Sequence, residues 1–196
     1  AIGSDALGGA KDSTADSSQF NIFMGVNSGN GAWVTAVSQY NIGIGHYTLD
    51  GAMNGAIHNT GVGHQALSAI TTGDYNTAFG STALYNTSNG EQNVAMGYKA
   101  LFTNSTGDNN VAIGNVALHT NASGDKNTAV GTISGYSVTT ASGSAFLGYQ
   151  AGRSVSTGND NIAIGNSAMY GGTVTGDNNI AIGVSAGDAL TSAYQN

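Results

Sequence analysis

The chain contains no cysteine and no proline, and only 8% of its 196 residues are charged. Without cysteine it can have neither a disulfide framework nor thiolate chemistry, which leaves the redox compartment open. Four lysines and arginines face eleven acidic residues, for a net charge of −7. Nucleic acids and anionic membranes are bound through basic patches, so this balance argues against both as partners. No apolar run approaches the roughly 18 residues of a membrane span, and we expect no membrane insertion.

Glycine is abundant instead, with 31 residues, and short phrases recur. The phrase "NNVAIGNVAL" at 109–118 returns as "DNIAIGNSAM" at 160–169. The glycines that close such phrases are Gly3, Gly25, Gly45, Gly63, Gly80, Gly97, Gly114, Gly131, Gly148, Gly165 and Gly183. Six successive intervals, from Gly63 to Gly165, are 17 residues long, whereas the first three are 22, 20 and 18. A fixed period of this kind is the mark of a repeat architecture.

The repeat predicts a stack of β-coils rather than helices. Two glycines in every unit would each cost about 1 kcal/mol inside a helix, whereas "NVAIG" is a short β-prone run bounded by turn residues. We therefore expect an all-β parallel β-solenoid of about 11 coils with a 17-residue repeat, each coil holding a strand, a glycine bend, a second short strand and a turn. Residues 1–58 should form irregular coils with loop insertions. Residues 59–196 should form regular coils that continue beyond both ends of the chain.

Equivalent positions of stacked coils should form columns. We expect an inward apolar column of Val62, Phe79, Met96, Ile113, Val130, Leu147, Ile164 and Ile182. A second column begins with Leu67, Leu84, Leu101 and Leu118 and continues with Gly135, Gly152, Met169 and Gly187. Stacked amides can hydrogen-bond along a column, so we predict a structural asparagine ladder of Asn76, Asn93, Asn110, Asn127, Asn161 and Asn179. The core is thin, which suggests that several chains pack together, most simply as a homotrimer.

Five positions after the closing glycine lies a column of rings with one arginine: Tyr85, Phe102, His119, Tyr136, Arg153 and Tyr170. Stacked rings and an arginine on a ring face are favourable. The column could be buried at a chain–chain contact or over the leucines, or it could be an exposed platform for sugar rings. Trp33 and Tyr40 belong to the first, longer coils. Trp33 and Tyr40 are candidate loop contact residues; alternatively, Trp33 could cover the core and Tyr40 could stack on Phe20.

Other polar positions suggest weaker possibilities. Acids follow the second glycine of each unit at Asp74, Glu91, Asp108 and Asp125. Such oxygens could bind Ca²⁺, although Gly-Asp is also ordinary turn chemistry, and no other cofactor is indicated. His46 and His64 should be neighbours, but two imidazoles are too few for a metal site, so none is predicted. No nucleophile elbow or phosphate-binding motif is present, so we expect no enzyme.

The units "NVAIGNVAL" and "NIAIGNSAM" resemble repeats of bacteriophage tail fibres and of the heads of trimeric autotransporter adhesins. The resemblance implies a parallel β-roll, three chains side by side, and attachment to host surfaces. Residues Asn110, Ala112, Ile113 and Gly114 would be architectural. The expected function is therefore an extracellular structural fibre segment, on a virion tail or a cell surface, that spaces or presents a receptor-binding region. The alternatives are a carbohydrate-binding β-solenoid, or a filament subunit that assembles end to end.

Overall fold

The computed structural model describes residues 2–6, 19–33 and 36–192. Within them the chain is a parallel β-solenoid with ten strands of three residues each. The strands are β1 (Ile22–Met24), β2 (Ile42–Ile44), β3 (Thr60–Val62), β4 (Thr77–Phe79), β5 (Val94–Met96), β6 (Val111–Ile113), β7 (Thr128–Val130), β8 (Ala145–Leu147), β9 (Ile162–Ile164) and β10 (Ile180–Ile182). They form one sheet in sequence order, so the expected fold class is confirmed.

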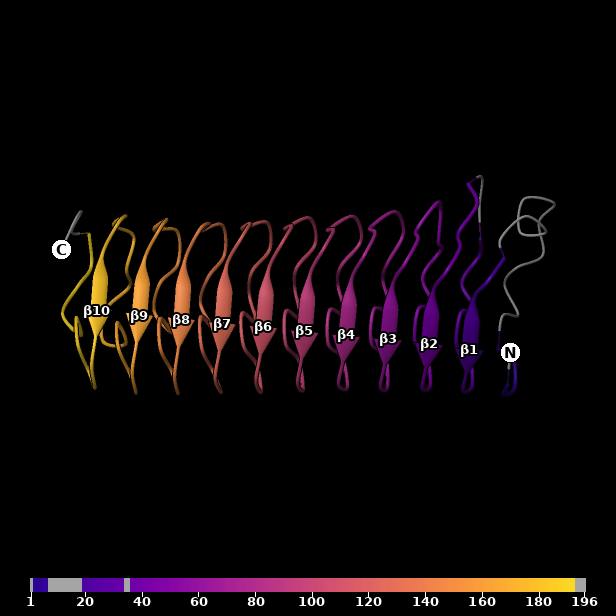
Figure 1. Cartoon of the computed structure of the whole chain (residues 1–196), viewed down its shortest axis with the longest axis horizontal. Helices are drawn as coiled ribbons and strands as arrows, with labels where there is room; N and C mark the ends of the chain where they lie inside the picture. Colours follow the sequence, from indigo (N-terminus) through magenta and orange to yellow (C-terminus); the bar gives the residue numbers. More distant parts are fainter. Residues whose placement is uncertain (1, 7–18, 34–35, 193–196) are drawn as a thin grey trace.

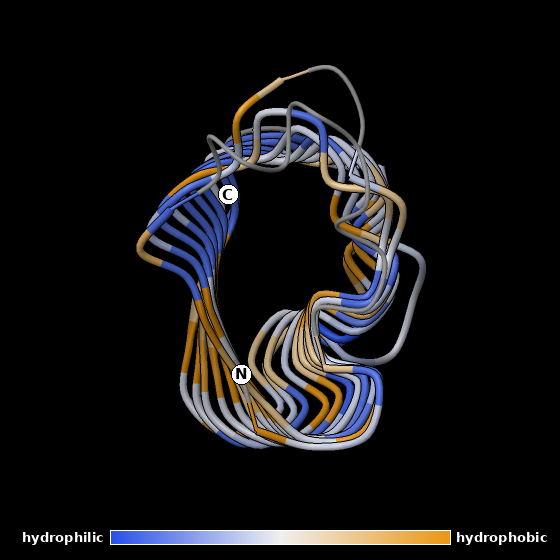
Figure 2. Ribbon diagram, turned by 90° about the vertical axis from the view of Figure 1, so that its right-hand side faces the viewer, coloured by the Kyte–Doolittle hydropathy of each residue, from blue (hydrophilic) through white to orange (hydrophobic). Residues whose placement is uncertain are grey.

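Equivalent residues of successive coils are paired, as the repeat predicts. Val111 pairs with Thr128, and Ile113 pairs with Val130. Figure 1 shows the strands side by side along the long axis, and Figure 2, viewed along that axis, shows the coils superimposed in a closed outline. Ile2 adds a parallel bridge to Met24, which places Gly3 at the start of the glycine column. None of the described residues forms a helix long and apolar enough to cross a membrane.

The closing glycine of each unit is required both by its backbone conformation and by its close contact with the next coil. Gly97 has φ +134°, a conformation that strongly favours glycine. A Cβ at this position would lie 2.5 Å from the carbonyl oxygen of Gly114 in the next coil. The glycine column therefore sets both the bend after each strand and the close spacing of the coils.

The prediction of a second short strand after the bend is wrong. This segment is a series of turns in which some non-glycine residues have positive φ, including Val116 at 50° and Leu118 at 47°. Its backbone still bonds to both neighbouring coils, since Val116 N–H donates to Tyr98 O and Leu118 N–H donates to Ser134 O. These inter-coil hydrogen bonds offset the cost of the left-handed residues, which is about 1–2 kcal/mol each.

The prediction that the last residue of each strand points inward is also wrong, because the middle residue of each strand points into the core instead. Ala112, the middle residue of β6, is fully buried, whereas Ile113 is 38% exposed. The same alternation runs along the stack, with Ala78 buried and Phe79 exposed in β4. Successive side chains of a strand point to opposite faces, so the small middle residue and the large last residue cannot both face inward.

The leucine column fills the interior and explains why the strands present alanine to it. Leu67, Leu84, Leu101 and Leu118 are all fully buried. With these side chains inside each coil, the facing strand has room only for a methyl group, because protein interiors are close-packed.

Two phenylalanines show the same space constraint in reverse. Phe146 replaces the inward alanine in β8, and the leucine position on either side of it is a glycine, Gly135 or Gly152. A Cβ on Gly135 would lie 2.8 Å from the Phe146 ring, and one on Gly152 would overlap it. The large and small positions have exchanged places, which keeps the interior filled.

The same exchange occurs in the long first coils. Phe23 is the buried middle residue of β1, and a Cβ on Gly29 or Gly43 would lie 2.8 Å from its ring. Trp33 is 3% exposed, packs edge-on against Phe23 with ring centroids 5.8 Å apart, and donates from Nε1 to Gly29 O. Trp33 therefore covers the core, and the alternative contact role is wrong for it.

Candidate interaction surfaces

The outer face of the ten-stranded sheet is largely apolar and partly exposed. It consists of the first and last residue of every strand, and we call it the sheet face; its polar members are Thr60, Thr77 and Thr128. Its most exposed large hydrophobic residues, each between 51% and 66%, are Ile22, Phe79, Leu147, Ile180 and Ile182. Tyr98 and Tyr149, each directly after a closing glycine, are 48% and 49% exposed. A largely apolar face of this length is a mark of an interaction surface.

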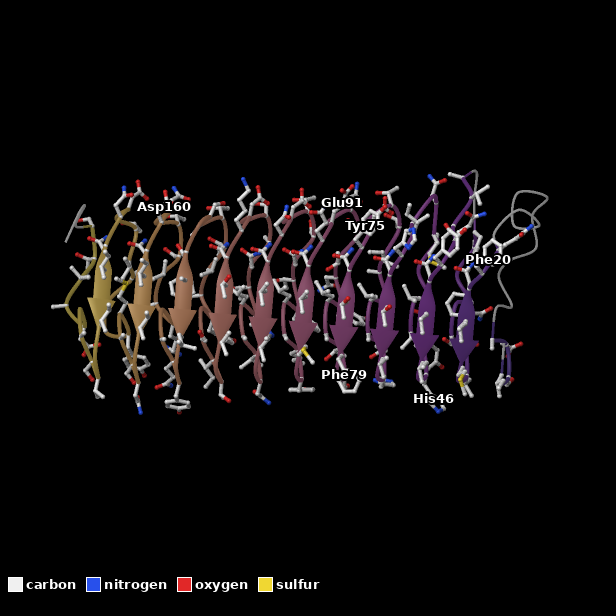
Figure 3. All side chains as sticks on the ribbon, in the orientation of Figure 1. Phe20, His46, Tyr75, Phe79, Glu91 and Asp160 are labelled. Atoms are coloured by element: carbon white, nitrogen blue, oxygen red, sulfur yellow. The ribbon has the colours of Figure 1, made fainter. Side chains whose placement is uncertain are left out.

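The sheet face carries no charge at all. None of the first or last residues of β1–β10 is acidic or basic, although the chain has a net charge of −7. Figure 3 places Glu91 and Asp160 along one edge of the solenoid, and Phe79 and His46 along the opposite edge. Identical copies could meet on this face without placing acids opposite one another.

The predicted aromatic column is a stack of rings, which we call the aromatic row. Ring centroids of Tyr85, Phe102, His119 and Tyr136 are 5.0–5.2 Å apart, with interplanar angles of 5–13°. Arg153 continues the row, with its guanidinium carbon 5.9 Å from the Tyr136 ring centroid and 5.2 Å from that of Tyr170. Because the ring faces are turned toward one another, the inner rings offer only their edges to a ligand. A platform on which sugars stack flat is therefore not available along the row.

His119 is constrained by its place in this row. Burial lowers the pKa of His119, and the positive charge of Lys99 lowers it further. The Nδ1 atom of His119 is buried, and none of the described residues forms a hydrogen bond with it. The folded chain therefore favours the neutral imidazole.

A second stack of rings precedes the asparagine ladder, and sequence reasoning found only its beginning. Phe20 and Tyr40 are stacked at 5.1 Å, as expected. The stack continues through His58 to Tyr75 at 4.8 and 5.0 Å. Figure 3 labels Phe20 and Tyr75 along one edge. The signal for the whole stack was present, since each of these four residues directly precedes an asparagine.

The asparagine ladder is confirmed in structure and is fully buried. Asn110 is typical: its backbone N–H donates to Asn93 Oδ1, and its Nδ2 donates to Gly124 O. Its own Oδ1 accepts the backbone N–H of Asn127. Ser144 continues the ladder by accepting the backbone N–H of Asn161 on its Oγ at 3.1 Å. The column is structural, because every polar atom of Asn110 is used within the stack.

The turn acids also bond between coils. Asp108 Oδ1 accepts the backbone N–H of Glu91 at 2.7 Å, and Asp125 Oδ1 accepts that of Asp108 at 2.8 Å. Asp74 does the same for Ile57. Calcium binding at these acids stays a prediction. Among the described residues, no group of three or more histidine, cysteine, aspartate or glutamate side chains is placed to hold a metal ion.

Two smaller sequence features can be located. His46 and His64 follow paired glycines and are both exposed, and His64 lies edge-on to the Tyr47 ring. The sequence also holds three Asn-x-Ser/Thr sequences, at Asn86, Asn104 and Asn121. Asn86 is exposed, whereas Asn104 and Asn121 are fully buried and Asn121 Nδ2 donates to Asn104 Oδ1 at 3.0 Å, so these two are inaccessible to glycosylation in the folded chain.

The described residues enclose no pocket. The candidate sites are thus surfaces, namely the sheet face and the aromatic row. No family model, no curated protein and no solved structure matches the chain.

Proposed function

We propose that the protein is a non-enzymatic structural fibre segment, on a phage tail or a cell surface, that spaces or presents a host-receptor-binding region. The observation that carries this proposal is the unbroken parallel stack from β1 to β10, which bears one charge-free apolar face along its length. The asparagine ladder binds each coil to the next from inside. Such a stack is suited to holding two points a fixed distance apart outside the cell.

In this proposal the sheet face is covered by identical chains, three to a fibre. Nine strand intervals of ~4.8 Å give the sheet face a length of roughly 43 Å. Measured along the strands and including the residue after each bend, the sheet face is about 13 Å wide. Three such faces turned toward one axis would bury roughly 1,700 Å² in the whole trimer, about 560 Å² from each chain. The absence of charge on the sheet face makes a second copy the partner that fits best.

Sedimentation at several protein concentrations tests the assembly. A closed homotrimer should show three times the chain mass over a wide range of dilution. Replacing Met96 and Ile113 by lysine should give single chains, because a desolvated unpaired charge is costly. The control is Asn109→Lys on the exposed side of the same coil, at a position where the equivalent residue of the next coil is Lys126.

Three results would contradict the proposed assembly. Single chains at every concentration would mean that the sheet face has no partner of its own kind. A mass that rises steadily with concentration would indicate end-to-end filaments instead. If the sheet-face variant kept the mass of the Asn109→Lys control, the interface would lie elsewhere. Electron microscopy of the intact fibre would then show which surface is free.

Carbohydrate binding is the second candidate function. It is favoured by the half-buried aromatic row, which contains an arginine and ends in the exposed Tyr170. This role is compatible with a fibre segment, because a fibre with several copies would multiply weak contacts.

A further inference from the structure

Arg153 is stacked between two rings, and among the described residues its charge has no acidic partner. Its guanidinium lies between the rings of Tyr136 and Tyr170, at 5.9 and 5.2 Å from their centroids. Among the described residues, no carboxylate or carbonyl oxygen accepts a hydrogen bond from its side chain. Its N–H groups therefore lack acceptors within this part of the chain.

Acidic residues outnumber basic residues by eleven to four, yet within the described part of the chain Arg153 forms no ion pair with an acid. A second cation, Lys99, is on the same row, with Nζ 5.3 Å from the Phe102 ring centroid. Lys99 and Arg153 thus both place a cation against a ring of the aromatic row.

The geometry suits a planar anion. A guanidinium is flat and presents its N–H donors in a fixed fork, which matches the two oxygens of a carboxylate. Stacking between two rings fixes its plane in advance, so little freedom is lost on binding. The edges of Tyr136 and Tyr170 add phenolic hydroxyls, which can exchange hydrogen bonds with sugar hydroxyls. Because the described residues enclose no pocket, the open surface around Arg153 suits an extended polymer better than a small ligand that needs an enclosed site.

We propose that Arg153, clamped between Tyr136 and Tyr170, binds the carboxylate of an acidic sugar in a polysaccharide. The sugar carboxylate meets the guanidinium edge, and the sugar hydroxyls exchange hydrogen bonds with the phenolic hydroxyls of the two tyrosines. This inference rests on the second candidate function, carbohydrate binding, and specifies its ligand class. It does not depend on the oligomeric state.

The test compares an oligogalacturonate with its methyl ester, which has the same sugar rings without the charge. Binding of both to the full chain is measured by calorimetry. We expect the acid to bind about 10-fold more tightly than the ester, as one charge-assisted pair allows. Arg153→Gln should reduce acid binding to the level of the ester. Lys126→Gln makes the same charge change at an exposed residue outside the row and should have little effect.

The outcomes separate the two levels of the proposal. If neither sugar binds, carbohydrate binding and the role of Arg153 both fail, although the fibre proposal stands. If acid and ester bind equally, or if Arg153→Gln and Lys126→Gln weaken binding alike, only the role of Arg153 fails. If Arg153→Gln instead lowers the sedimenting mass, the guanidinium holds an acid of another chain, and the proposal is overturned. Arg153→Lys should recover binding only in part, since a lysine cannot form the planar pair.

Discussion

Replacing Asn110 by alanine should remove two hydrogen bonds from the middle of the stack. The bond from Nδ2 to Gly124 O, at 2.8 Å, is lost, and so is the bond from the Asn127 backbone N–H to Oδ1, at 2.9 Å. The bond from the Asn110 backbone N–H to Asn93 Oδ1 remains. The Asn127 N–H is left without a partner at about 1–3 kcal/mol. Gly124 O still accepts Nδ2 of Asn121 at 2.9 Å and loses only one of two bonds, worth about 0.5–1.5 kcal/mol. The free energy of unfolding should therefore fall by about 2–4 kcal/mol.

Serine at the same position should cost much less. Ser144 shows that a serine Oγ can accept the backbone N–H of the next coil. Asn110→Ser therefore loses only the bond to Gly124 O, which still accepts Nδ2 of Asn121, and we expect a loss of about 0.5–1.5 kcal/mol. The matched control is Asn115→Ala, which changes an exposed asparagine of the same coil and should lie within about 0.5 kcal/mol of the parent.

The assay is denaturant unfolding at a fixed chain concentration, together with hydrogen exchange of the Asn127 amide. The exchange measurement is needed because repeat arrays can unfold locally, and a global midpoint can then miss a local change. The Asn127 amide should exchange much faster in Asn110→Ala than in Asn110→Ser. Equal stability of these two variants, or unchanged exchange at Asn127, would refute the view that the ladder holds the coils together.

Three further predictions concern packing, backbone strain and pH. Phe146→Ala should lower the free energy of unfolding by about 3–5 kcal/mol, the usual cost of deleting a buried ring. Adding Gly135→Leu should recover part of this loss, and a double-mutant cycle by thermal unfolding measures the coupling. If the effects of the two substitutions simply added, the exchange of large and small positions would be contradicted. Val116→Asn should raise the free energy of unfolding by up to about 1 kcal/mol, since asparagine tolerates positive φ better than valine; a net loss in denaturant unfolding would mean that packing of the valine matters more. The pKa of His119 is lowered by burial. The contribution of His119 to stability is therefore complete above the unfolded pKa of about 6.5 and is lost as the pH falls through the lower folded pKa. Melting temperatures measured from pH 8 to pH 5 should fall less in His119→Phe than in the parent, and the control His64→Gln should behave as the parent does.

Sequence periodicity by itself was enough to predict the stack. A 17-residue period leaves each coil unable to bury its apolar side alone, so neighbours must lie in register, and Ile113 does pair with Val130. It also predicted the asparagine ladder and the aromatic row, because residues that recur at the same position of every coil lie next to one another in the stack. These features depend only on counting along the chain.

The direction in which each strand faces was decided by tertiary structure. Ala112 and Ile113 alternate along β6, and the period of two permits either residue to point inward. Hydrophobicity alone favoured the isoleucine. The buried leucine column, including Leu118, occupies the interior, and only a methyl group fits opposite it.

The second half of each coil was likewise outside the reach of sequence patterns. Val116 is a β-branched residue that by propensity favours a strand, yet it has φ 50°. Its N–H donates to Tyr98 O of the preceding coil, and Leu118 two residues on donates to Ser134 O of the following coil; these bonds exist only once the stack has formed. The same reversal of the strands turned the expected core into the sheet face, because side chains that the close-packed interior excludes must lie outside.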